Sequence, residues 1–386
     1  MTRPAIPFGR PSISEAERAA VMAVLGQDIL THGPRVREFE QVFAAFAGDG
    51  AHCLAVSSCM AALHLAYLHL GLGPGDEVIV PAQTHTATAH AVEAVGARPV
   101  FVDCEEATGN IDPALIADAI TPRTRAVSLV HFIGIPCRMH EILGIASRHG
   151  LSVVEDCALA VGARYDGRHV GLFGDIGCFS FYPVKHLTTA EGGMVTTRHQ
   201  QVASAVAALR AFGVDRSHGE RAIPGMYDVV AFGLNYRMSE LQAALGVEQV
   251  KRVDALLSAR RSNFLHLQSA LAEIDELTVL DSRDELAVSS HYCMSIVLRG
   301  ALAPRRDGIV ARLNALGVGT SIYYPRPVPG MTYYRTKYGY HPENFPNAEN
   351  ISRHSIALPI APHVTSDDVD YIADCLKGAI AASSMA

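Results

Sequence analysis

A lysine at position 185 follows a strand-like run in the segment CFSFYPVKHLTTAEGG. Only four of the 32 lysines and arginines in this chain are lysines. A lysine amine can lose its proton and attack a carbonyl, whereas the guanidinium of arginine stays charged. Lys185 is therefore a candidate for holding an aldehyde as a Schiff base. The alternative is a surface lysine whose stem lies along the protein.

An aspartate at position 156 could supply the second group that such chemistry needs. Asp156 ends the strand-like run SVVED. A pyridine-type cofactor needs a lysine for its aldehyde and a carboxylate for its ring nitrogen, so that the ring can act as an electron sink. A carboxylate at the end of a strand is also a common helix cap, and this alternative stays open.

Hydroxyl groups at the start of a helix indicate a phosphate site. Ser57 and Ser58 precede the helical run CMAALHLAYLHLG. The free amides and the dipole of such a helix attract an anion. Ser180 is a second hydroxyl close to Lys185 in the chain. The alternatives are ordinary N-capping by the serine pair and packing of Ser180 between its two aromatic neighbours.

The elements that must position these residues lie between about residues 51 and 197. Strand-like runs such as EVIVPA and RAVSLV alternate there with helical runs. This alternation predicts crossover units and a mostly parallel sheet covered by helices on both faces. Ligands gather at the carboxyl ends of such strands, where Asp156 and Lys185 both fall.

The pattern changes after residue 197. A helical stretch from about Ser239 to Ile274 is followed by short strands, including VGTSIYY, and by further helices. We therefore expect two domains, a large one over residues 1–250 and a smaller α+β one over residues 251–386.

The composition favours a globular protein that acts on small molecules. The chain has 386 residues, 49% of them hydrophobic, and a formal net charge of -7, with no basic run that would bind nucleic acid. It has neither a signal-peptide layout nor a membrane-spanning apolar run, so we expect a cytoplasmic protein. The eight cysteines form no C-x-x-C pair, and Gly144 stands where an H-E-x-x-H motif beginning at His140 needs a histidine, so no metal is expected.

Across almost its whole length the sequence resembles the DegT/DnrJ/EryC1/StrS family of sugar aminotransferases, which depend on pyridoxal 5'-phosphate (PLP). The segments VVEDCALAVGARYDGRHVGLFGDIGCFSFYPVKHLTTAEGGMV and LNYRMSELQAALG carry the resemblance, with weaker support from IPFGRPSISEAERAAV and LPIAPHVTSDDVDYI. The resemblance implies an α/β fold, the three-layer fold-type I PLP-transferase. Its mostly parallel central sheet would be joined to a smaller C-terminal α+β domain.

The resemblance also implies roles for individual residues. Lys185 would form the internal aldimine and move the proton, and Asp156 would contact the pyridine nitrogen. Ser58, the backbone amides of Cys59 and Met60, and Ser180 would cradle the phosphate.

Three further positions belong to the same comparison. His85 matches an aromatic residue that stacks on the cofactor ring, and the alternative is a polar residue at a helix start. Asn235 matches a residue that the neighbouring subunit supplies to the phosphate, which implies a homodimer with its active site at the subunit interface. Arg237 would bind substrate or pair structurally.

Three departures from the family pattern carry information. Cys59 and Met60 replace a glycine and a threonine, which removes a hydroxyl from the phosphate turn. Leu159 replaces a glutamine or histidine near the 3'-oxygen of the cofactor. Ala190 replaces the first glycine of a GEGG segment. None of these changes removes the lysine, so a lysine-less dehydratase of the family is excluded.

The function implied is transfer of an amino group from an amino acid, expected to be glutamate, to a keto-sugar, expected to be nucleotide-linked. One alternative is a PLP enzyme of the same fold that acts on a cyclitol ketone or dehydrates a sugar. Another is a non-catalytic PLP-binding regulatory protein.

Overall fold

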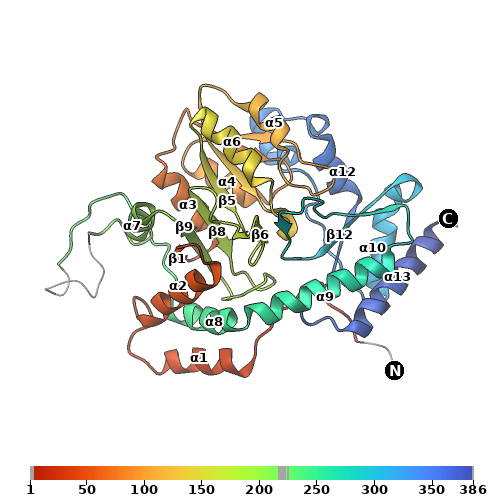
Figure 1. The fold of residues 1–386 in the computed structure, drawn as a ribbon, viewed down its shortest axis with the longest axis horizontal. Helices are drawn as coiled ribbons and strands as arrows, with labels where there is room; N and C mark the ends of the chain where they lie inside the picture. The colour runs from red at the N-terminus through yellow and green to blue at the C-terminus, as the bar shows by residue number, and fades with distance from the viewer. Residues whose placement is uncertain (1–3, 216–222, 224–225, 385–386) are drawn as a thin grey trace.

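The computed structural model describes residues 4–215, 223 and 226–384, and its centre is a seven-stranded sheet (Figure 1). In spatial order the strands are β1 (His52–Val56), β9 (Gly193–Thr197), β8 (Ile176–Ser180), β5 (Ser152–Asp156), β4 (Thr124–Val130), β2 (Glu77–Pro81) and β3 (Arg98–Val102). The pairs from β8 to β3 are all parallel, and β9 runs antiparallel to both β1 and β8. The prediction of a mostly parallel sheet is therefore confirmed.

Helices cover both faces of this sheet, as expected for buried parallel strands. One face carries α3 (Cys59–His69), α4 (Thr86–Ala94) and α7 (Gln200–Leu209); the other carries α2 (Pro34–Ala47), α5 (Pro113–Ala119), α6 (Met139–His149) and α8 (Glu240–Lys251). Successive residues of a strand point to opposite faces. In β2, Val78 and Val80 accordingly pack toward α3 and α4, whereas Ile79 packs toward α5 and α6. The result is a three-layer core.

The edge strand β1 is shielded by a side-chain pair. The Glu40 carboxylate accepts a hydrogen bond from the Ala55 amide at 2.9 Å, and the Arg210 guanidinium donates to the Ala55 carbonyl at 2.6 Å. Arg210 and Glu40 also form an ion pair with each other. An exposed strand edge would otherwise offer these backbone groups to another chain.

The long helical stretch predicted from Ser239 to Ile274 is two helices, α8 and α9 (Val253–Leu271). The helical course is interrupted at Arg252, which has φ -109° and ψ 3°. Its guanidinium donates to the backbone carbonyl and the hydroxyl of Ser12 and pairs with the buried Glu17 of α1 (Glu15–Leu25). Anchored in this way, α8 stays against α1 while α9 leads away to the C-terminal part (Figure 1).

The C-terminal part is α+β, as predicted. An antiparallel sheet of β10 (Leu277–Val279), β12 (Met294–Leu298) and β13 (Ser355–Leu358) packs with α9, α10 (Arg306–Ala315) and α13 (Ser366–Ser384). The predicted strand VGTSIYY is wrong: only Val318 and Ser321 form isolated bridges, and the segment is otherwise an irregular connection. The domain boundary near residue 250 falls between α8 and α9 and stays a prediction.

The described residues that adjoin α7 and α8 in the connection between them extend away from the body of the molecule (Figure 1). Its two sides are joined by bridges between Ala211 and Asn235 and between Val214 and Val229. We call the described residues 211–215 and 226–237 the arm. Among the residues that the structure describes, no helix combines the length and the apolar character needed to cross a membrane.

Candidate active site

Asp156 and Lys185 come together at the carboxyl edge of the central sheet. Asp156 is the last residue of β5 and pairs in register with Cys178 of the neighbouring β8. The chain leaves β8 after Ser180 and carries Lys185 in the loop that returns to β9. Both side chains therefore start from the edge where parallel strands place ligand-binding groups, as the sequence predicted.

The Asp156 carboxylate is almost completely buried, and both of its oxygens accept hydrogen bonds. The Thr88 hydroxyl donates to Oδ2 at 2.8 Å, and the Ala158 amide donates to Oδ1 at 3.0 Å. The Cys59 thiol lies 3.8 Å from Oδ1, within the longer range of a sulfur donor. The Ala158 bond closes a local turn and is not the helix cap considered for Asp156, because residues 157–163 form no helix. The carboxylate is also held from a separate helix by Thr88.

The Lys185 side chain is half-buried and lies over an aromatic ring. Its Nζ is 5.3 Å from the ring centroid of Tyr292. Burial lowers the pKa of this amine, because a desolvated ammonium is disfavoured, while the nearby Cys59 and Asp156 act in the opposite direction. A lowered pKa leaves more of the amine unprotonated and nucleophilic. This environment differs from that of an ordinary surface lysine.

The N-terminus of α3 points toward the same place. Ser58 is its N-cap, and its Oγ accepts from the Ala61 amide at 3.1 Å, so the hydroxyl proton can still be donated elsewhere. The amides of Cys59 and Met60, at the first helical positions, have no partner within the helix. Ser58 is therefore an N-cap, which is the alternative that the sequence left open for it. Its hydroxyl proton stays available for a hydrogen bond to an anion.

Close packing holds this helix end against β9. A Cβ atom added at Gly193 would lie 2.5 Å from the Ser58 carbonyl carbon and 2.7 Å from the Cys59 nitrogen. Only a glycine allows this approach. Ser180, nearly buried at the end of β8, pairs in register with Gly193, which brings the second predicted phosphate donor to the same corner.

His85 also faces this region, and it is the N-cap of α4. Its Nδ1 accepts from the Ala87 amide at 3.1 Å, which matches the alternative of a helix-start residue. Its ring also stands edge-on to Tyr324, with centroids 5.6 Å apart. Desolvation lowers the pKa of the His85 imidazole; the nearby Asp156 acts to raise this pKa, and the nearby Lys185 acts to lower it. The cap fixes the tautomer without using the ring faces, so stacking stays compatible with it.

Asn235 lies at the base of the arm, and its side chain is exposed in the single chain. The next residue, Tyr236, accepts a hydrogen bond from the Ser57 amide through its carbonyl and contacts His64 of α3 through its hydroxyl. Arg237 stacks its guanidinium over Phe212 at 5.2 Å. The stacking supports a structural role for Arg237.

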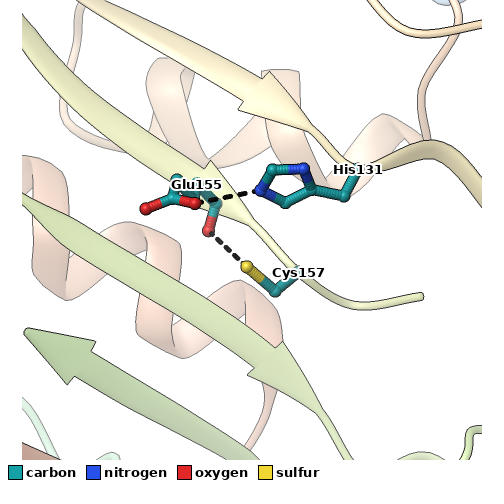
Figure 2. A group of neighbouring side chains, drawn as sticks. All are labelled: His131, Glu155 and Cys157. Atoms are coloured by element: carbon teal, nitrogen blue, oxygen red, sulfur yellow. Dashed lines mark hydrogen bonds and ion pairs between the residues drawn. The ribbon is translucent and has the colours of Figure 1, made fainter. Parts of the chain in front are cut away.

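Three side chains of the types that bind metals, His131, Glu155 and Cys157, lie close together near Asp156 (Figure 2). The Glu155 carboxylate is bonded to His131 at 3.0 Å and also accepts three backbone amides of the 171–174 loop. The other imidazole nitrogen accepts from the Cys137 amide. Burial raises the pKa of the Cys157 thiol, which disfavours the thiolate that binds metals. The group is a loop anchor with its polar atoms already used.

The departures noted in the sequence have structural counterparts. Ala190 has φ +66°, the left-handed region that favours glycine, which explains the glycine usual at this position. Leu159 is buried, and its carbonyl, not its side chain, contacts the Ser290 hydroxyl. Cys59 places a thiol beside Asp156.

Several residues at the site were not singled out from the sequence. Thr84 and Thr88 support Asp156. Three tyrosines lie close by: Tyr292 contacts Lys185, Tyr324 stands edge-on to His85, and Tyr323 is hydrogen-bonded to Tyr292. Thr88 stands three residues after His85 on one helix turn, and this spacing was a usable signal. The tyrosines come from C-terminal segments more than 100 residues away, and local sequence holds no signal for that contact.

The fold and this set of groups define a PLP-dependent enzyme. A half-buried amine, a carboxylate held by donors, and a hydroxyl at a helix N-terminus beside a second hydroxyl at the end of β8 match the aldehyde, ring nitrogen and phosphate of that cofactor. A family model described as the DegT/DnrJ/EryC1/StrS aminotransferase family matches residues 11–377, and the chain belongs to this family. It is a sugar aminotransferase of fold type I that uses PLP.

Individual relatives agree with this placement. The spore coat polysaccharide biosynthesis protein SpsC of Bacillus subtilis is 39% identical over 382 residues, covering 97% of this chain and 98% of its own. A Streptococcus pneumoniae protein described as a sugar aminotransferase, solved in its PMP form, superposes with a TM-score of 0.92 at 29% identity, over 98% of this chain and 100% of its own. DesV of S. venezuelae has a TM-score of 0.89 and 33% identity, over 97% and 98% of the chains.

Proposed function

We propose that this enzyme transfers the amino group of glutamate to the keto group of a nucleotide-linked sugar. The observation that carries the proposal is the presence of the half-buried Lys185 amine and the anchored Asp156 carboxylate at one sheet edge. The cofactor, when bound, supplies the aldehyde that takes up the amino group and the ring that delocalises the electron pair.

Each residue of the site has a defined task in this proposal. Lys185 would hold the cofactor through its Nζ, and the same amine would serve as the general acid and base. Asp156 pairs with the ring nitrogen. Ser58, Ser180 and the first amides of α3 bind the phosphate, and the imidazole of His85 stacks on the ring.

The substrate class rests on the relatives. SpsC is named for spore coat polysaccharide biosynthesis, and a Helicobacter pylori aminotransferase, PseC, is described as involved in the biosynthesis of pseudoaminic acid. The superposition with PseC covers 98% of this chain and 100% of PseC, with 25% identity and a TM-score of 0.92. We infer a comparable role in making a glycan building block, with a cytoplasmic location.

We also propose that the enzyme is a homodimer whose arm completes the partner's site. Several large hydrophobic side chains of the arm are exposed in the single chain, including Phe232, at 75%, together with Val230 and Tyr227. Exposed apolar groups gathered on one projecting segment mark an interaction surface. Asn235, exposed at the base of the same arm, would reach the partner's phosphate site.

The direct test is Lys185→Ala. This variant should lose the visible absorbance of the bound cofactor and the half-reaction with glutamate together, because both need the same amine. Lys251→Ala is a matched control, since Lys251 is an exposed lysine that forms an ion pair with Glu248 of its own helix. Turnover retained in Lys185→Ala would refute the assignment. Detection of the amine in the product separates transamination from a dehydration.

A further inference from the structure

The Asp156 carboxylate is the end of a chain of hydroxyl donors that comes from α4. Thr88 Oγ1 lies 2.8 Å from Asp156 Oδ2, and Thr84 Oγ1 lies 2.8 Å from Thr88 Oγ1. Both threonines are buried. Nothing in the cofactor-binding roles described above requires either hydroxyl.

The direction of this chain follows from proton counting. An ionised carboxylate only accepts hydrogen bonds, so Thr88 donates its single hydroxyl proton to Asp156. Thr88 can then only accept from Thr84, which makes Thr84 the donor in their mutual bond. Each hydroxyl polarises the next, so the chain stabilises negative charge at its end.

The support of the chain is rigid. Thr88 lies in the first turn of α4, which His85 caps. At the other end of α4, the Glu93 carboxylate accepts hydrogen bonds from the hydroxyls of Tyr333 and Tyr338 and pairs with Lys337. One helix therefore holds both the donor for Asp156 and the residue proposed to stack on the cofactor.

We propose that Thr88, backed by Thr84, is a positioning residue that holds the Asp156 carboxylate aligned toward the cofactor ring nitrogen. This inference rests on the proposed function, because it assigns Thr88 an effect that passes through the contact between Asp156 and the cofactor. Thr88 itself touches neither substrate nor cofactor in this assignment. A purely structural Thr88 would only fill space between α4 and β5.

The test compares Thr88→Val, which keeps the shape and removes the donor, with Thr88→Ser, which keeps the donor. The readout is the dissociation constant of the cofactor-free enzyme for PLP and for its 1-deaza analogue, in which carbon replaces the ring nitrogen. Hydrogen bonds to charged groups are strong enough that Thr88→Val should weaken PLP binding roughly tenfold or more. Thr88→Ser should stay within about threefold of the wild type.

The analogue separates positioning from packing. Because it has no ring nitrogen for Asp156 to hold, Thr88→Val should bind it as well as the wild type does. Equal losses for both ligands, or no loss for PLP, would overturn the role of Thr88. Thr84→Val should show a smaller loss confined to PLP, and wild-type affinity there would remove Thr84 from the chain. If the wild-type enzyme failed to bind PLP, the proposed function itself would fail instead.

Discussion

Lys185 shows how a single side chain trades stability for reactivity. Its pKa is lowered in the folded protein by burial, so the charged form is disfavoured there relative to the unfolded chain. Above the ordinary pKa of lysine the amine is neutral in both states, and its burial costs no ionisation energy. The free energy of unfolding then decreases as the pH falls through the lowered pKa of the folded state. The desolvated Lys185 amine should therefore lower the free energy of unfolding of the cofactor-free enzyme at neutral pH.

Lys185→Met is expected to raise the melting temperature of the cofactor-free protein at pH 7, because it removes a buried charge and keeps the length of the side chain. The difference from the wild type should shrink as the pH approaches 10.5, the ordinary value for lysine. Thermal melts across this pH range measure it. A constant difference at every pH would show that packing, and not ionisation, causes the effect.

At the scale of elements, the close packing of the start of α3 against β9 positions the proposed phosphate site. Gly193 brings β9 so close to Ser58 and Cys59 that no side chain fits between them. The helix amides are thereby fixed beside Ser180. The replacement of the usual glycine and threonine by Cys59 and Met60 leaves this backbone geometry in place.

Gly193→Ala should force the start of α3 away from β9, since overpacking of this kind costs about 1–3 kcal/mol. We expect the affinity for PLP to fall about tenfold, with a lower melting temperature. Gly144→Ala in α6 is the matched control: its Cβ would meet only Arg148 Nη1, at 3.6 Å. Cofactor titration followed by absorbance compares the two. Wild-type affinity in Gly193→Ala would contradict the proposed geometry of the phosphate site.

At the scale of the whole molecule, the proposed dimer assigns the residues of each active site to two subunits. Lys185 and Asp156 belong to one chain, whereas the exposed Asn235 is proposed to act in its partner. The Tyr236 carbonyl holds the base of the arm beside Ser57 of its own chain. A twofold dimer could place this base close to both phosphate sites, so only an experiment on mixed subunits separates the two arrangements.

Mixed dimers of Lys185→Ala and Asn235→Ala provide that experiment. If Asn235 acts across the interface, one site of each mixed dimer has both intact residues, and activity should reappear at limiting PLP. Differently tagged chains, co-expressed and purified through both tags, allow the measurement. If Asn235 serves its own chain, the mixed dimer should show no more activity than Asn235→Ala alone supplies.

The sequence by itself determined the parallel sheet, the C-terminal α+β arrangement and the candidate pair of Lys185 and Asp156. These features are local: apolar periodicity specifies each strand and helix, and a strand end specifies where a side chain emerges. The hydroxyls of Ser58 and Ser180 were also candidates from the sequence, and the structure brings them to the same corner. Comparison with the family added His85 and Asn235.

Only the tertiary structure decided what surrounds those residues. The break at Arg252 coincides with contacts to Ser12 and Glu17, more than 200 residues away. The segment VGTSIYY forms isolated bridges to Ile6 and Ala357, at distant places in the chain, in place of the predicted strand. The tyrosines around Lys185 and the bond from Thr88 to Asp156 likewise join distant segments. Periodicity reports which face of an element is buried, but not which partner covers it, and that partner sets the charge and reactivity of the site.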